Sequence, residues 1–302
     1  MKLLDRVCPL CGSQDDSQVV AEANYDESGL GQFAFASRKT PEFMHFRLVR
    51  CPDCDVLYAN PAPALDWLRD RYHGAGFDSA SESSYAARSY ARELRRIAGA
   101  LPSRDGALDI GAGDGAFLEQ LLANGFSSVV GLEPSTAPID QARPELRALL
   151  REGFFEGGDF QDASLSLITC CQTLEHTDDP LGLCNSAFRI LKPGGALFTI
   201  AHDSRALSAK LLGVRSPIYD IEHLQLHSRR SLHFMLEHAG FERIEVRALR
   251  NDYPLSYWLK LMPLEVAVKE RLANLLKRLH LDGVVMPMWP GNLVASGFKP
   301  GA

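Results

Sequence analysis

The stretch that decides the fold is Leu108-Asp109-Ile110-Gly111-Ala112-Gly113-Asp114-Gly115. The residues Ala107–Ile110 predict a short buried strand, and the glycine-rich loop after it leads into a predicted helix that ends near Gly125. Glycines let the backbone approach a ligand closely, and a helix N-terminus presents free N–H groups to it. The stretch therefore predicts a strand, a binding loop and a helix of the kind that binds nucleotides.

Two classes of nucleotide cofactor fit this loop. Its first two glycines and Ala116 match the dinucleotide fingerprint G-x-G-x-x-G/A. Glu133, which follows the predicted strand Val129–Leu132, would bind ribose hydroxyl groups in either case. Asp109 and Asp114 flank the glycines, and carboxylates suit the ammonium and sulfonium groups of S-adenosylmethionine better than a pyrophosphate. We therefore favour S-adenosylmethionine over NAD as the cofactor.

Strands and helices alternate through the rest of the chain. Residues 165–171 and 196–201 predict two strands with a helix between them, and residues 241–249 and 292–299 predict a sixth and a seventh strand. We expect the seventh strand to be antiparallel at the end of the sheet. The alternation predicts an α/β fold with a doubly wound sheet, whose ligands bind at the carboxyl ends of its strands. The polar residues expected at such ends are Asp109, Glu133, Asp159 (in Glu156–Phe160, which we expect to end a strand) and Gln172.

Four of the seven cysteines form two C-x-x-C pairs, Cys8 with Cys11 and Cys51 with Cys54. Each pair presents two thiolates from a tight turn, and two pairs complete a tetrahedral shell around Zn²⁺ that leaves no position open for water. The long gap between the pairs would hold an inserted hairpin. A redox pair is the alternative, but neither pair lies in the strand–helix–strand context of such motifs. The sequence therefore predicts a structural zinc site.

Length and charge limit the functions that the chain can have. Its 302 residues are enough for about two domains, and the formal net charge is −6. Residues 1–75 hold 8 Lys and Arg against 11 Asp and Glu, which is the wrong sign for binding a nucleic-acid backbone. No apolar run reaches the ~18 residues of a membrane span, and the start of the chain resembles no secretion signal, so we expect a cytoplasmic protein.

A set of motifs carries a resemblance to a known family. In chain order they are Leu108–Gly115, Leu132–Ser135, Gln172–His176, Leu191–Gly195 and His238–Phe241. With the cysteine pairs, they resemble class I S-adenosylmethionine-dependent methyltransferases of the subgroup that has an N-terminal zinc-binding module. The resemblance implies a seven-stranded Rossmann-like sheet and a reaction whose product is S-adenosylhomocysteine. It says almost nothing about the acceptor.

The resemblance also implies roles for the matching residues. The loop Gly111–Gly115 would pass under the methionine part of the cofactor, with Asp109 near its amino group. Glu133 would bind both ribose hydroxyls, Asp159 and Phe160 would border the adenine, and Gln172 would face the reaction centre. The implied cofactor-binding set is Asp109, Gly111, Ala112, Gly113, Asp114, Gly115, Glu133, Pro134, Asp159, Phe160 and Gln172.

The segment 201–228 follows the predicted fifth strand and would overhang the cofactor. His223 is the leading candidate for a general base, because imidazole titrates near neutral pH and the neighbouring Glu222 could orient it. The alternative is that both side chains only bind the backbone of their own segment. His202 and Tyr219 are the further catalytic candidates in this segment.

The run Tyr219-Asp220-Ile221-Glu222-His223 resembles the Tyr-His-Glu-His run of sugar C-methyltransferases, which also carry a zinc module. Here the tyrosine is displaced and one histidine is missing, and we see no room for the further C-terminal domain of those enzymes. C-methylation therefore stands beside O- and N-methylation, which need only alignment and sometimes one base.

These observations predict a zinc-binding module in residues 1–75, a linking helical segment in 76–104 and a methyltransferase domain in 105–302. An inserted helical segment at about 251–289 would be core, a lid over the acceptor, a dimer face or a peripheral membrane contact. We expect methyl transfer to a small-molecule acceptor, such as a sugar or a nucleotide- or lipid-linked sugar. The alternatives are an RNA or protein methyltransferase that uses the zinc module for recognition, and a non-catalytic cofactor-binding regulatory or scaffold protein.

Overall fold

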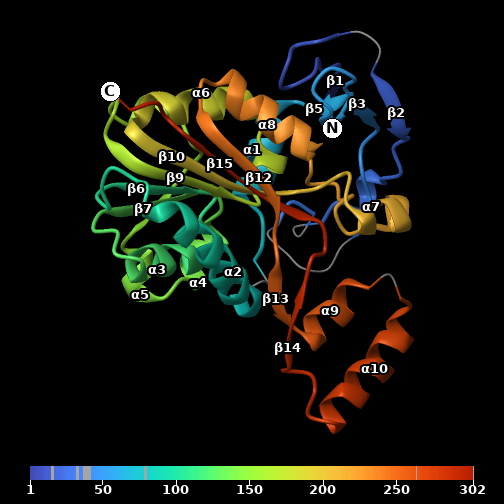
Figure 1. Cartoon of the computed structure of the whole chain (residues 1–302). Coiled ribbons are helices and arrows are strands. Elements are labelled where there is room, and N and C mark those ends of the chain that lie inside the picture. The colour runs from blue at the N-terminus through green and yellow to red at the C-terminus, as the bar shows by residue number, and fades with distance from the viewer. Residues whose placement is uncertain (15–16, 32–33, 37–41, 78–79, 263, 302) are drawn as a thin grey trace.

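The computed structural model describes residues 1–302 except 15–16, 32–33, 37–41, 78–79, 263 and 302. Its centre is a seven-stranded sheet in the order β12-β15-β10-β9-β6-β7-β8 (Figure 1). The pairs from β10 to β8 are parallel, and β15 runs antiparallel to both of its neighbours, so the predicted α/β sheet is confirmed. The strands are β6 (Ala107–Ile110), β7 (Val129–Glu133), β8 (Leu150–Glu152), β9 (Leu165–Cys171), β10 (Leu191–His202), β12 (Glu242–Ala248) and β15 (Asn292–Phe298).

Two expectations about this sheet are wrong. The antiparallel strand β15 lies inside the sheet, between β10 and β12, and β12 forms the edge. Residues 293–298 of β15 are all buried and need a neighbour on each side, whereas β12 has no buried residue. The strand expected to end at Glu156–Phe160 is β8, which ends earlier. Gly157–Asp159 is a 3-10 turn instead, packed so closely on α6 that a Cβ on Gly157 would lie 2.6 Å from Ser186 Oγ.

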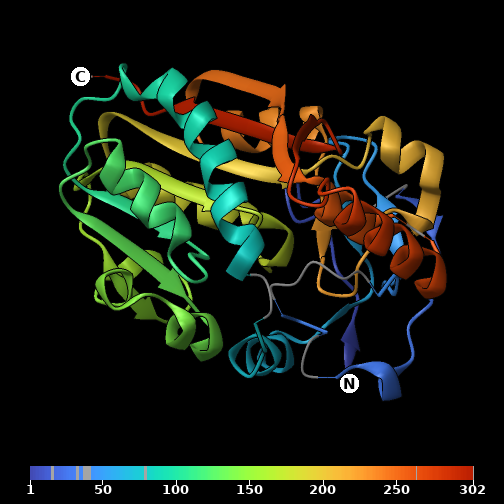
Figure 2. The same cartoon turned by 90° about the horizontal axis from the view of Figure 1, so that it is seen from below.

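Helices cover both faces of the sheet, as a doubly wound fold requires. On one face, α2 (Ala80–Ala98) and α3 (Ala116–Ala123) share a hydrophobic core with the sheet, and Figure 2 shows α2 crossing that face. On the other face, α6 (Pro180–Ile190) and α8 (Arg229–His238) share a second core with it. The short helices α4 (Thr136–Gln141) and α5 (Pro144–Arg147) lie between β7 and β8 in the chain.

The N-terminal part is built around a small antiparallel sheet of order β11-β4-β3-β2. β2 and β3 pair between the two cysteine motifs, where the sequence predicts a hairpin, whereas β11 comes from the segment that follows His223. The two parts that the sequence presents as separate modules thus share one sheet. The elements are β1 (Leu3–Leu4), β2 (Gln18–Ala21), β3 (Leu48–Arg50), β4 (Leu57–Ala59), β5 (Ala62–Pro63), α1 (Leu65–His73) and β11 (Gln225–Leu226).

Residues 251–289 form an arm that projects from the body of the molecule (Figure 1). Its base is anchored because Tyr253, Tyr257 and Trp258 belong to the core shared with α2 and α3. No helix among the described residues is both long and apolar enough to cross a membrane. The arm consists of β13 (Asn251–Pro254), α9 (Leu255–Leu261), α10 (Val266–Arg278) and β14 (Val285–Met288). Outside the arm, the short helix α7 (Leu207–Leu212) follows β10 in the chain.

Candidate active site

The glycine-rich loop between β6 and α3 is held against β7. The N–H groups of Gly111 and Ala112 both donate to the carbonyl oxygen of Leu132 at 2.9 Å. Gly111 and Gly113 have left-handed φ angles of 74° and 55°. A Cβ on Gly111 would lie 2.2 Å from Thr173 Oγ1, whereas a Cβ on Gly113 would meet nothing within 4 Å. The first glycine therefore serves packing, and the second leaves the backbone open to a ligand.

Two buried carboxylates stand beside this loop, on β6 and β7. Glu133 Oε2 accepts the N–H of Gly113 and Oε1 accepts that of Ser135, both at 2.9 Å. Asp109 Oδ1 accepts the hydroxyl of Thr169 at 2.6 Å. Burial raises the pKa of each carboxyl to about 7, although these hydrogen bonds act to lower it. Such a pair suits a ligand that offers hydroxyl groups and positive charge.

Both carboxylates line a cavity of about 1060 Å³ at the carboxyl ends of the strands. A pocket for one small ligand has a volume of about 300–1,000 Å³, so this cavity has room for a cofactor and an acceptor together. The Nε2 atom of Gln172 is buried in its wall, and among the described residues it has no hydrogen-bond partner. The predicted cofactor residues that line the cavity are Asp109, Gly111, Ala112, Gly113, Asp114, Glu133, Pro134 and Gln172.

Three predicted cofactor residues lie outside the lining of this cavity. Gly115 is the residue before α3, and a Cβ there would contact a side chain of α5. Asp159 is exposed in the turn after β8, and Phe160 packs on Phe155 with ring centroids 6.1 Å apart. Phe154 and Phe155 line the cavity instead, because β8 ends earlier than the sequence predicts. The adenine-bordering role of Asp159 and Phe160 stays a prediction, one that this placement does not favour.

Three histidines meet at the cavity. The ring centroid of His223 lies 5.0 Å from those of both His176 and His202. His223 Nδ1 lies 2.8 Å from the carbonyl oxygen of Ile218, and His176 Nδ1 lies 3.1 Å from that of Glu222. A carbonyl oxygen only accepts hydrogen bonds, so both rings carry a proton on Nδ1. The neutral rings therefore hold their proton-accepting lone pair on Nε2.

The structure brings together three of the four predicted catalytic residues. Glu222, His223 and His202 all line the cavity. Tyr219 does not: it is buried in the core of the small sheet, with its ring centroid 6.1 Å from that of His45. The displaced tyrosine of the sequence run thus points to packing, not to the cavity. Two lining residues that the sequence does not predict as catalytic are His176 and Tyr72.

Buried polar contacts tie the loop after β9 to the segment that carries His223. The carboxylate of Glu175 is fully buried and accepts the backbone N–H of His202, and burial raises the pKa of Glu175 to about 7. Gln225 Nε2 donates to the carbonyl oxygen of Thr177 at 2.7 Å. From α1, the hydroxyl of Tyr72 donates to the carbonyl oxygen of Glu222 at 2.8 Å. These contacts hold the histidines in place from three separate elements.

The four N-terminal cysteines form one cluster. Their sulfur atoms all lie within 4.8 Å of one another. The Sγ atoms of Cys8 and Cys54 are 3.4 Å apart and those of Cys11 and Cys51 are 3.5 Å apart, far longer than the ~2.05 Å of a disulfide. Zn–S bonds of ~2.3 Å in a tetrahedron place the sulfurs about 3.8 Å apart. The cluster therefore has the donor set and the spacing of a four-thiolate metal site.

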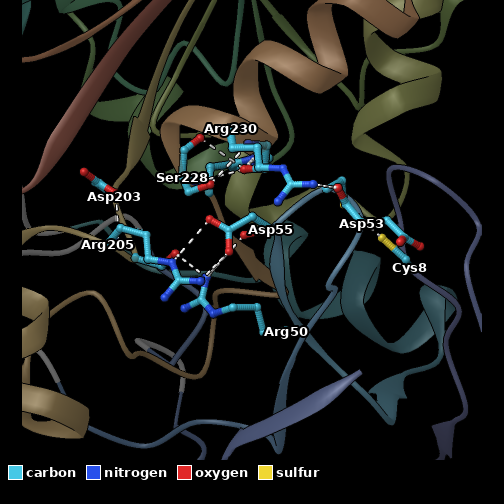
Figure 3. Close-up of polar contacts among 12 residues, drawn as sticks. Cys8, Arg50, Asp53, Asp55, Asp203, Arg205, Ser228 and Arg230 are labelled. Atoms are coloured by element: carbon cyan, nitrogen blue, oxygen red, sulfur yellow. Dashed lines mark hydrogen bonds and ion pairs between the residues drawn. The ribbon is translucent and has the colours of Figure 1, made fainter. Parts of the chain in front are cut away.

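Asp55 joins the second cysteine pair to the larger domain (Figure 3). It takes a left-handed φ of 66°, as Gly12 does after the first pair with a φ of 71°. Its carboxylate lies 2.5 Å from the guanidinium of Arg205 and 3.5 Å from that of Arg50. Burial alone would raise the pKa of Asp55, but hydrogen bonds from Arg205 and Ser228 and the two positive charges hold it below its usual value.

The domain is that of a class I S-adenosylmethionine-dependent methyltransferase. Its defining features are the parallel sheet with the antiparallel strand β15, the glycine loop beside Glu133 and the buried carboxylate of Asp109. Residues 83–246 match the methyltransferase domain family, and the chain belongs to this family. The family binds S-adenosylmethionine, in agreement with the residues that line the cavity.

Known proteins similar to this chain support the same class. Over 127 residues the chain is 32% identical to the ubiquinone biosynthesis O-methyltransferase of Actinobacillus pleuropneumoniae, a match that covers 39% of this chain and 53% of that protein. It is 30% identical over 117 residues to the enzyme of the same name from Pseudomonas aeruginosa, covering 35% and 49%. The chain thus spans about half the length of the curated relatives it matches. A candidate methyltransferase structure from Bacillus halodurans shares the fold, with a TM-score of 0.50, 20% identity and coverage of 70% and 98%.

Proposed function

We propose that this chain transfers a methyl group from S-adenosylmethionine to a small-molecule acceptor. The observation that carries the proposal is that the loop, its two carboxylates and the three histidines all line one cavity. When bound, the cofactor supplies an electrophilic methyl group on a positively charged sulfur. Glu133 would hold its ribose hydroxyls, Asp109 its ammonium group, and the open side of Gly113 would face its methionine part.

His223 is the residue that we propose as general base. Its Nδ1–H donates to the carbonyl oxygen of Ile218, which fixes the ring and makes Nε2 the nitrogen that would take a proton from the acceptor. Glu222 Oε1 lies 3.8 Å from this Nε2, so its carboxylate would stabilise the imidazolium that forms. His202 and His176 lie beside the same ring and would orient the acceptor.

For the acceptor itself, we propose a sugar or a nucleotide- or lipid-linked sugar, on the Glu222-His223 pair and its resemblance to the sugar C-methyltransferases. The matched relatives carry the name O-methyltransferase, which makes a hydroxyl oxygen the first acceptor atom to test. The acidic balance of residues 1–75 disfavours the RNA alternative.

We also propose that the four-cysteine cluster holds one structural Zn²⁺. The sulfur spacing fits a tetrahedral site, and a closed thiolate shell stabilises a fold without taking part in the reaction. Metal analysis should find stoichiometric zinc in the purified chain. A folded wild-type chain without metal would contradict this role.

Two measurements test the cofactor and the acceptor. Calorimetry should find binding of S-adenosylhomocysteine and none of NAD. A methyl-transfer screen over nucleotide sugars, lipid-linked sugars, small phenols and total RNA should then find turnover on a small molecule. A chain that binds S-adenosylhomocysteine but methylates only RNA would refute the proposed acceptor class, and a chain that does not bind it would refute the function.

The base is tested by a matched pair of histidine variants. His223→Ala should lower kcat about 10²- to 10⁴-fold, the range for loss of a general base, while the affinity for S-adenosylhomocysteine stays the same. His233→Ala is the control, because His233 is a half-exposed residue of α8 outside the cavity lining. Equal kcat in the two variants would refute the role of His223.

A further inference from the structure

The arm carries an apolar helix face that is exposed to solvent. None of the 13 residues of α10 is buried. Three residues of α10 and the residue directly after it recur at the spacing of one helix face. They are Val268 (38% exposed), Leu272 (38%), Leu275 (50%) and Leu279 (56%). We name these four side chains the α10 stripe.

Further exposed apolar residues lie next in sequence to residues that line the cavity. Trp289, after β14, is 64% exposed, and Leu211 on α7 is 75% exposed. α7 is joined to the end of the arm, because Ser208 Oγ donates to the carbonyl oxygen of Pro290 at 2.6 Å. Met262 of the arm is itself exposed and also lines the cavity. Exposed apolar residues thus occur on elements that also line the cavity, as expected of an interaction site.

α10 is basic although the chain as a whole is acidic. The helix contains four basic residues and one acidic residue, Glu270, whereas the net charge of the whole chain is −6. At about 100° per residue, Arg271 and Arg278 fall along one flank of the α10 stripe. A second copy packed antiparallel on the stripe, about a two-fold axis perpendicular to the helices, would bring these cationic flanks together. Anionic lipid headgroups would neutralise them instead.

We propose that the arm binds the surface of an anionic lipid bilayer through the α10 stripe and its flanking arginines. An interfacial helix of this kind lies in the plane of the bilayer, with apolar side chains below the headgroups and basic ones among them. Trp289 suits the boundary between the headgroups and the acyl chains, because its indole combines an apolar ring system with a polar N–H group. The cavity would then open at the bilayer, and an amphiphilic acceptor would enter between α7 and the arm. Only this last step rests on the proposed methyl transfer.

Vesicle binding by the whole chain tests the proposal. The protein should cosediment with mixed phosphatidylcholine–phosphatidylglycerol vesicles, and more weakly with phosphatidylcholine alone or at high salt. Leu275→Asp with Leu279→Asp should weaken binding about tenfold or more. Arg271→Ser and Arg278→Ser should each weaken it about fivefold at low salt. Leu122→Asp is the control, because Leu122 is an exposed leucine of α3, away from the arm, and it should change nothing.

The proposal fails if the wild-type chain does not bind anionic vesicles, or if Leu122→Asp weakens binding as much as the double variant Leu275→Asp with Leu279→Asp. It also fails if light scattering shows that the wild-type chain is a dimer and that the double variant is a monomer. Retained affinity for S-adenosylhomocysteine shows that each variant is folded. Should the double variant not fold, Trp289→Ser must weaken vesicle binding for the proposal to stand. A chain that binds vesicles but not S-adenosylhomocysteine would refute the proposed function and leave the docking proposal intact.

Discussion

Cofactor affinity should depend steeply on pH because the two carboxylates beside the glycine loop are buried. Burial raises the pKa of Asp109 and of Glu133 to about 7 in the cofactor-free protein. Binding an ammonium group and a ribose diol requires both groups ionised, so binding must release any proton that they hold. At pH 6 a group with a pKa of 7 is ionised in about one molecule in eleven, which weakens binding about tenfold for each group.

We therefore expect the Kd for S-adenosylhomocysteine to rise about a hundredfold between pH 8 and pH 6 if the two groups titrate independently. Calorimetry at pH 6, in buffers that differ in ionisation enthalpy, should detect release of up to two protons, and at pH 8 almost none. Glu133→Gln should remove about half of this pH dependence. His223→Gln should leave it in place, which separates the carboxylates from the histidines. A Kd that is the same at pH 6 and pH 8 would refute the reasoning.

The same shifts predict the opposite trend for the stability of the cofactor-free fold. Each carboxyl has a folded pKa above its unfolded value, so the folded state holds more protons between about pH 4 and pH 7. The free energy of unfolding should therefore fall as the pH rises through this window and level off above it. Saturating S-adenosylhomocysteine should offset that fall, because it binds only the ionised, folded form.

Three further predictions concern packing and the cysteine cluster. Gly111→Ala and Gly113→Ala both place a side chain on a left-handed backbone, which should lower the free energy of unfolding by about 1–2 kcal/mol. Only the Gly111 variant also meets Thr173, which should lower it by about 1–3 kcal/mol more. Equal decreases for the two variants in urea denaturation would contradict this. Cys8→Ser should lose the bound zinc and lower the Tm, and an unchanged zinc content would speak against the four-thiolate shell. Asp55→Asn keeps a residue type that tolerates the left-handed backbone but leaves the charge of Arg50 uncompensated. The free energy of unfolding should therefore fall by about 1–3 kcal/mol. An unchanged Tm would show that the ion pairs of Asp55 contribute nothing to stability.

The cofactor side of the site could be predicted from the sequence because its signals are local. Asp109, Gly111 and Glu133 lie at the ends of two short apolar strands, and strand ends of a parallel sheet converge at one edge whatever the rest of the chain does. The adenine side is less secure, because the glycine-rich stretch after β8 resembles a strand end in the sequence but forms a 3-10 turn in the structure. The conformation of this stretch depends on its contact with α6, and a contact between distant residues cannot be predicted from the local sequence pattern.

The acceptor side could be predicted only in part, for the same reason. Glu222 and His223 are neighbours in the sequence, and their chemistry can be recognised from that alone. Tyr72 and His176 are 104 residues apart, and only the folding of α1 against the loop after β9 brings them within 3.3 Å. Tyr219 shows the reverse case, since a reactive residue type within a promising run lies in a hydrophobic core and outside the cavity lining.

The second cysteine pair shows why the cluster belongs to the framework of the active site. Glycine would fill the left-handed position after each pair at the lowest cost, and the first pair uses Gly12. The second pair uses Asp55 at a backbone cost of about 1–2 kcal/mol, which its charged hydrogen bonds, at about 1.5–3 kcal/mol each, can offset. Those bonds reach Arg205 in the loop after β10, and β4 pairs with β11 just beyond His223. Loss of the proposed zinc should therefore disturb the acceptor side first. The loop below Glu133 should keep its shape, because among the described residues it has no charged hydrogen bond to the cluster.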